Sequence, residues 1–231
     1  MNRAMLFFSG ELPPMPPRTR PNFEIESRLR RDGQWPIAGV DEVGRGPLAG
    51  PVAAAAVILD PDRLPDGLDD SKAMSPKARE AAFERIMSQA RAVSLAFVPA
   101  SEIDATDIRT AALLAMARAV AGLALRPAHV LVDGRDLPRL PCSGRAIVKG
   151  DATSLSIAAA SIVAKVARDA AMRGLAELYP AYGFETNAGY GAPRHLEALA
   201  QFGPTPYHRL SFSPLRARRA RPVPFCGDPV E

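Results

Sequence analysis

The chain is poor in the residues that build zinc sites, disulfide scaffolds and membrane spans. Its 231 residues include two cysteines, Cys142 and Cys226, and three histidines, and none of them lies at the spacing of zinc ligands. The sequence therefore indicates neither a structural zinc site nor a disulfide framework. The apolar run at 4–8 is too short for the core of a signal peptide and far too short to cross a membrane. We expect a cytoplasmic protein with no membrane partner.

Excess charge of one sign is also small. The net charge is +4 and the sequence pI about 9.4, which alone favours polyanionic partners only weakly. Proline is concentrated before residue 23 and arginine after residue 208. We expect a disordered N-terminal tail at 1–22, one folded domain with a helical C-terminal part at 23–213, and a flexible basic tail at 214–231. The arginines of that last tail are equally consistent with a solvated segment that aids solubility.

The middle of the chain alternates short apolar runs with helical patterns. Runs of small and β-branched residues predict five strands, at 36–44, 51–61, 92–100, 128–134 and 145–151. Cap residues and helical spacing predict helices at 23–33, 69–90, 101–125 with a break near its start, 153–180 and 194–202. Only a short turn separates the first two strands, so they form an antiparallel hairpin. The prediction is an α/β fold with a central mixed sheet flanked by helices.

Acidic residues follow three of these strands. Asp41 and Glu42 close the first, Asp133 closes the fourth, and Asp151 follows the fifth. Ligands bind outside the carboxyl ends of strands in open α/β sheets, so these acids are expected to converge. Their mutual repulsion is relieved by Mg²⁺ or Mn²⁺, which prefer oxygen ligands.

Each acid also has a purely structural interpretation. Asp133 is typical of a turn before glycine, and Asp151 of a helix N-cap. Successive strand residues point to opposite faces, so Asp41 and Glu42 reach one site only if the strand ends there.

The glycine-rich stretch 44–50 follows the first strand and resembles a dinucleotide fingerprint. That interpretation places a pyrophosphate beside Asp41 and Glu42, which would repel it. Pro47 and a second strand also replace the helix whose N-terminus would bind the phosphates. No Walker-type phosphate loop occurs anywhere in the chain, so we exclude both classes of nucleotide-binding protein.

Seven blocks of sequence, in this order, resemble the bacterial ribonuclease HII family between residues 36 and 213. They are GVDEVGRGPLAGPV, DSK at 70–72, LVDG at 131–134, KGD at 149–151, IAAASIVAKVARD at 157–169, YGFETNAGYG at 182–191 and HRLSF at 208–212. One departure is Ala192, where the family usually carries threonine, and there we expect at most a changed local contact.

The resemblance implies a ribonuclease H-like fold with a small helical C-terminal extension. It implies a metal-dependent endoribonuclease that cleaves the RNA strand of RNA–DNA hybrids and nicks 5′ of single ribonucleotides in duplex DNA, with a two-metal mechanism. The metal-binding and catalytic carboxylates would be Asp41, Glu42, Asp133 and Asp151. The ribonucleotide and its 2′-hydroxyl would contact Gly44, Arg45 and Gly46, and Tyr190 would lie against the sugar at the RNA–DNA junction.

Three lysines are candidate phosphate contacts, and surface positions explain them equally well: Lys72, Lys149 and Lys165. Two other functions compete with the main one. A ribose-blind metal nuclease of the same fold shares the carboxylates but has no need of Gly-Arg-Gly beside them. A non-catalytic basic nucleic-acid-binding module is disfavoured because free carboxylates weaken phosphate binding. We expect a monomer.

Overall fold

The computed structural model describes residues 20–216. Most of the two predicted tails, at 1–22 and 214–231, therefore lies outside the described residues, as does Cys226. Leu215, just past the predicted end of the folded domain, is buried. No helix in the described range is long and apolar enough to cross a membrane.

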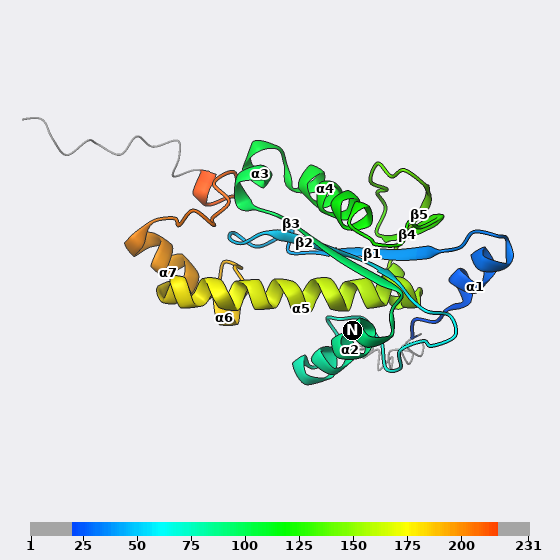
Figure 1. Cartoon of the computed structure of the whole chain (residues 1–231). Helices are drawn as coiled ribbons and strands as arrows, with labels where there is room; N and C mark the ends of the chain where they lie inside the picture. The colour runs from blue at the N-terminus through cyan, green and yellow to red at the C-terminus, as the bar shows by residue number, and fades with distance from the viewer. Residues whose placement is uncertain (1–19, 217–231) are drawn as a thin grey trace, which may run out of the picture.

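A five-stranded mixed sheet forms the centre of the molecule (Figure 1). Its order is β3-β2-β1-β4-β5. The strands are β1 (Ile37–Val43), β2 (Val52–Ile58), β3 (Ala92–Val98), β4 (His129–Asp133) and β5 (Ser143–Ile147). The first three pair antiparallel, as the short turn predicts, whereas β4 and β5 run parallel to β1. The predicted α/β fold with a mixed sheet is confirmed.

Helices cover both faces of the sheet (Figure 1). The described helices are α1 (Glu24–Arg31), α2 (Pro76–Gln89), α3 (Ala100–Ala105), α4 (Ile108–Ala121), α5 (Leu155–Leu178), α6 (Phe184–Asn187) and α7 (Pro193–Phe202), with 3-10 turns η1 (Gly150–Ala152) and η2 (Pro180–Tyr182). The long helix α5 lies along one face and α4 along the other, and α2 packs on the outside of α5.

Alternation along the strands sorts the core into two layers. In β2, Ala54 and Ala56 pack in the cluster beneath α4, whereas Ala55 and Val57 pack in the cluster beneath α5. In β1, Gly39 faces α5 so closely that a Cβ there would collide with the backbone of Ser156. Odd-numbered residues of β1 therefore face α5 and even-numbered residues face α4.

The observed elements are mostly shorter than predicted by one to three residues at an end, and three differ more. The helix predicted at 69–90 begins only at Pro76, because Ser75 caps it and the DSK segment before it forms a turn. The helix predicted at 101–125 is split, because Asp107 accepts hydrogen bonds from two N–H groups and starts α4 afresh. The fifth strand ends at Ile147 rather than 151, and Asp151 lies in the 3-10 turn that follows.

The C-terminal extension packs on the far end of α5. Its core contains Tyr182, Phe184 and Leu199, together with Leu48 and Ala49 from the glycine-rich stretch. The extension therefore lies directly against the segment that follows β1, the strand carrying Asp41.

Candidate active site

Three of the four predicted carboxylates come together. Asp41 of β1, Asp133 at the end of β4 and Asp151 of η1 each offer an oxygen within 4.8 Å of the others. They meet because β1, β4 and β5 run parallel, so their carboxyl ends lie at one edge of the sheet. A group of three carboxylates at this separation fits a divalent cation, which prefers oxygen ligands.

The backbone after β5 holds two of these acids in place. The N–H of Gly150 donates to Oδ1 of Asp133 at 2.6 Å. Lys149, just before it, has a left-handed conformation with φ of 56°, which turns the chain into η1. Asp151 is thus carried to the site by a tight turn and not by the strand itself.

Burial and mutual repulsion raise the pKa of two of the grouped carboxylates. Burial raises the pKa of Asp41 well above its usual range, and the negative charges of Glu42 and Asp133 raise it further. The pKa of Asp151 is raised by burial and by the charges of Asp133 and Asp70. A bound cation would reverse these shifts and keep the group ionised.

A pair of buried serines supports Asp41, and sequence reasoning missed it. Ser161 of α5 hydrogen-bonds to the Asp41 side chain, and its hydroxyl lies 2.7 Å from that of Ser71. Asp41 faces α5, and Ser161 lies one helical turn beyond Ile157 on the face of α5 that packs against β1, so it can reach the carboxylate. The available signal was the DSK block, in which Ser71 stands between two charged residues.

Glu42 takes the opposite face, so the two adjacent acids diverge. The strand runs on to Val43, within the predicted range 36–44, so the condition for both acids to reach one site, a strand that ends at them, is not met. Glu42 faces α4 and pairs with Arg45 at 3.4 Å. Burial raises its pKa, Arg45 opposes that rise, and Asp133 adds to it, so Glu42 still borders the carboxylate group.

The glycine turn and Tyr190 lie against each other beside the acids. A Cβ on Gly46 would be 3.3 Å from Cε1 of Tyr190, and the tyrosine side chain is about half exposed. Gly44 has φ of 95° and touches the Arg168 side chain, so only glycine fits there without strain. Gly46 and Tyr190, far apart in the sequence, therefore form one surface next to the carboxylates.

These features match a known family along most of the chain. The family model of ribonuclease HII matches residues 38–214. The chain belongs to the ribonuclease HII family. Curated relatives include the ribonuclease HII of Sinorhizobium fredii, 53% identical over 91% of both chains, and that of Brucella canis, 55% identical over 86% of this chain and 91% of the relative.

Solved structures support the same fold. The ribonuclease H2 of Pyrococcus horikoshii superposes with a TM-score of 0.68 and 29% identity, covering 78% of this chain and 95% of that one. The predicted resemblance and the ribonuclease H-like fold are confirmed. As a member of the ribonuclease HII family, the chain is a hydrolytic endoribonuclease.

The three predicted phosphate-binding lysines occupy different settings in this ribonuclease HII fold. The charge of Lys72 lowers the pKa of Asp151, so it lies near the carboxylates. Lys149 is exposed in the turn before η1. Lys165 pairs with Asp169 at 2.6 Å.

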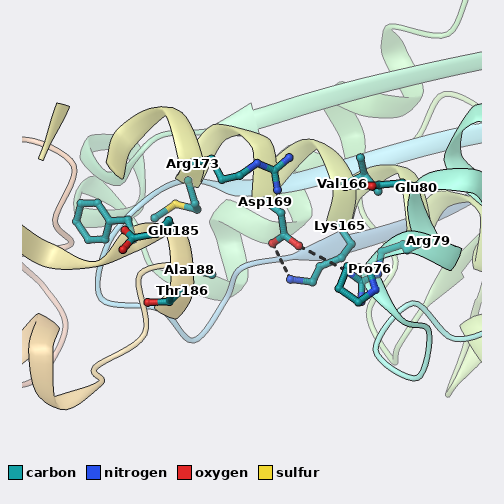
Figure 2. A pocket seen from close by; sticks show the side chains of 12 residues that line it. Pro76, Arg79, Glu80, Lys165, Val166, Asp169, Arg173, Glu185, Thr186 and Ala188 are labelled. Atoms are coloured by element: carbon teal, nitrogen blue, oxygen red, sulfur yellow. Dashed lines mark hydrogen bonds and ion pairs between the residues drawn. The ribbon is translucent and has the colours of Figure 1, made fainter. Parts of the chain in front are cut away.

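A pocket of about 240 Å³ lies between α2, α5 and α6, and Lys165 lines it. Figure 2 shows Asp169 between Lys165 and Arg79, whose guanidinium lies 3.7 Å away. The positive charge of Lys165 is thus largely neutralised by Asp169 within the protein.

Two histidines, His195 of α7 and His208 of the last family block, are buried together. Nε2 of His195 lies 2.9 Å from Nε2 of His208. Thr205 donates its N–H to Nδ1 of His208, so His208 carries its proton on Nε2 and donates to His195. His195 in turn donates from Nδ1 to the carbonyl of Tyr190 at 2.7 Å. The pair is neutral and structural, and it fixes the backbone of Tyr190.

Proposed function

We propose that this endoribonuclease cleaves the RNA strand of RNA–DNA hybrids and nicks duplex DNA on the 5′ side of single ribonucleotides. One observation carries the proposal: a three-carboxylate group lies directly beside a glycine turn packed on an exposed tyrosine. The first can hold a divalent cation, and the second offers close backbone approach to a sugar.

The acids would hold Mg²⁺ or Mn²⁺, in a two-metal arrangement. Asp41 is the most buried of the three grouped carboxylates and is our candidate for the principal ligand, with Asp133, Asp151 and Glu42 beside it. A bound divalent cation supplies Lewis acidity to the phosphate and neutralises the carboxylates. The cleavage experiment below compares the two ions directly.

The protein groups orient this assembly. Ser161 and Ser71 fix the rotation of the Asp41 carboxylate, and the Gly150 N–H engages one oxygen of Asp133. One water adds to the phosphorus, the bond to the upstream O3′ breaks, and that oxygen takes up a proton. The products are a 3′-hydroxyl and a 5′-phosphate, and the ribose 2′-hydroxyl is not consumed.

Ribose selection belongs to the glycine turn. The 2′-hydroxyl separates RNA from DNA, and Gly44 and Gly46 let the backbone approach it. Arg45, half exposed and paired with Glu42, would contact the ribonucleotide or its phosphate. The ring of Tyr190 would cover the sugar at the RNA–DNA junction.

Phosphate contacts from Lys72, Lys149 and Lys165 would position the duplex without reading its sequence. Action as a monomer and a cytoplasmic location stay predictions, as does the small effect of Ala192. The partner of the reaction is the nucleic acid itself, an RNA–DNA hybrid or ribonucleotide-containing duplex DNA.

Three labelled duplexes test the proposal: all DNA, DNA with one internal ribonucleotide, and a full RNA–DNA hybrid. Each is incubated with the protein and Mg²⁺, Mn²⁺ or EDTA, and the cut position is mapped. We expect metal-dependent nicking 5′ of the lone ribonucleotide, cleavage of the hybrid and an intact all-DNA duplex. Cleavage of all three would indicate a ribose-blind nuclease, and binding without cleavage would indicate a basic binding module.

A further inference from the structure

Three separate segments of the chain meet at the glycine turn. The N–H of Leu48 donates to the carbonyl of Gly189 at 2.8 Å, and that of Gly50 donates to the carbonyl of Tyr207 at 2.9 Å. Arg209 donates its own N–H back to Leu48 at 2.8 Å. The turn is therefore built into the C-terminal extension and is not a free loop.

The side chain of Arg209 enters the turn and is fully buried. Its Nη2 donates to the carbonyl of Gly44 at 2.6 Å and to that of Gly50 at 2.8 Å. Its Nη1 donates to the carbonyl of Arg45 at 2.9 Å, and its Nε donates to Gly50 at 3.0 Å. One planar guanidinium thus fixes both ends of the turn.

Arg168 of α5 holds the same turn from the other side and is equally buried. Its Nε donates to the carbonyl of Pro51 at 3.0 Å, and its Nη2 donates to that of Ala188 at 3.1 Å. Its side chain also fills the space beside Gly44. The segments before and after the turn are thereby tied to α5 and to the loop that carries Tyr190.

Neither guanidinium lies within ion-pair distance of a carboxylate in the part of the chain that is described. Burying a charged group without an opposite charge is unfavourable unless hydrogen bonds replace the lost water. Here backbone carbonyls replace it. Lysine has one nitrogen and cannot reproduce this planar fork, so the arrangement needs arginine.

The captured carbonyls determine where the neighbouring N–H groups point. A trans peptide directs its C=O and N–H to opposite sides. Because Arg209 binds the carbonyls of Gly44 and Arg45, the N–H groups of Arg45 and Gly46 point away from it. Within residues 20–216 neither of these N–H groups donates a hydrogen bond to another group.

We propose that Arg209, supported by Arg168, is a positioning residue that holds the N–H groups of Arg45 and Gly46 outward as ready donors to the ribonucleotide. The inference rests on the proposed function, in which this turn reads the ribose. Its chemistry is hydrogen bonding alone, with no group transferred. Specificity for ribose would then depend on a buried side chain that never touches the substrate.

The test compares Arg209→Lys and Arg209→Met with Ile86→Ala, a core control between α2 and α5 that leaves the turn intact. Hydrogen exchange is followed at the amides of Leu48, Ala49 and Gly50. Steady-state cleavage of the lone-ribonucleotide duplex and Mn²⁺ affinity are measured on the same preparations. Arg168→Lys serves as a second route should Arg209→Met fail to fold.

Both Arg209 variants should exchange the turn amides at least about tenfold faster than wild type and lose about 100-fold in kcat, because small misplacements of a positioning group have effects of that size. KM and Mn²⁺ affinity should change less than about threefold. The control should lose global stability without either local effect. Lysine keeps the charge, so its failure to rescue kcat separates geometry from charge.

Two results would overturn the inference: Arg209→Lys cleaving with a kcat within threefold of wild type, or turn amides that exchange as in wild type. A different result tests the proposed function itself. If the wild-type protein leaves the lone-ribonucleotide duplex intact, both the proposed function and the recognition of ribose by the turn are refuted. The exchange rates then still decide whether Arg209 holds the turn.

Discussion

The carboxylate group and the glycine turn lie side by side but are built in opposite ways. In the carboxylate group, Asp41, Asp133 and Asp151 repel one another, and burial raises the pKa of Asp41 and Asp151. In the turn, the buried guanidinium groups of Arg168 and Arg209 donate hydrogen bonds to backbone carbonyls, which stabilise their charge. A bound cation would offset the repulsion in the first region, whereas the second is held together by hydrogen bonds within the protein.

This difference separates two tasks. A site that must change its charge state on binding gains affinity for metal from the repulsion it stores. A surface that discriminates a single hydroxyl gains from groups already in position, because little order is then lost on binding. The two regions should therefore respond differently to substitution, metal and pH.

The largest effect is expected in the carboxylate group. Asp41→Asn removes its most buried carboxylate while preserving side-chain shape, so cleavage should fall by about 1000-fold or more. Binding of an uncleavable duplex in EDTA should change little. Single-turnover cleavage and fluorescence anisotropy measure the two quantities. An Asn variant near the wild-type rate with Mg²⁺ would show that the metal site is elsewhere.

Gly44→Ala should damage the turn without touching the acids. The backbone there has φ of 95°, and a methyl group would collide with Arg168. We expect a loss of about 1–3 kcal/mol in the free energy of unfolding and about 100-fold in kcat. Urea unfolding and steady-state kinetics check these effects. Gly134→Ala is a matched control, since it has φ of 99° but open space around it, and it should lose stability with a smaller kcat effect.

Sequence patterns located the carboxylate group better than the support around it. Asp41, Asp133 and Asp151 were expected to meet because each follows a strand of one sheet, which is a rule of topology. Ser161 and Arg209 escaped prediction because their partners lie 90 and more than 150 positions away. Such contacts depend on how the helices and the extension pack, and local spacing carries no trace of that.

The diverging acid pair shows the limit of boundary prediction. Both acids could share one site only if the strand ended at them, but the ladder continues through Glu42 and Val43 opposite Ala54 and Ala53. The position of the strand end, to within one or two residues, therefore decides whether both acids share a face. Alternation then sends Glu42 toward α4.

Without metal, the carboxylate group should make stability fall as pH rises. Raised pKa values of Asp41, Glu42 and Asp151 mean that the folded state keeps protons that the unfolded state has released above about pH 4. In EDTA, the urea midpoint should therefore decrease from pH 5 toward neutrality, and Asp41→Asn should flatten that decrease. Saturating Mg²⁺ should raise the midpoint most at neutral pH. A wild-type midpoint that Mg²⁺ leaves unchanged would contradict the cation site.

The histidine pair behind Tyr190 should act with the opposite sign. Burial and the neighbouring His195 lower the pKa of His208 from 6.5 to about 4, so the unfolded state binds a proton first as pH falls below 6.5. This contribution removes about 1–2 kcal/mol of stability between pH 7 and pH 5. In an Asp41→Asn background, which silences part of the carboxylate effect, His208→Gln should reduce that acid loss. An unchanged pH profile would show that the pair already titrates normally.

The smallest effects are expected for the lysines, of which Lys72 lies near the carboxylate group and Lys165 lies outside both regions. Lys72 lies near Asp151 of the carboxylate group, so Lys72→Gln should raise KM several-fold and lower the salt slope of binding by about 1. Lys165 is already paired with Asp169, so Lys165→Gln should change KM less than about twofold. Salt titrations of duplex affinity distinguish them. Equal slopes for the two variants would mean that Asp169 releases Lys165 to a phosphate when the duplex binds.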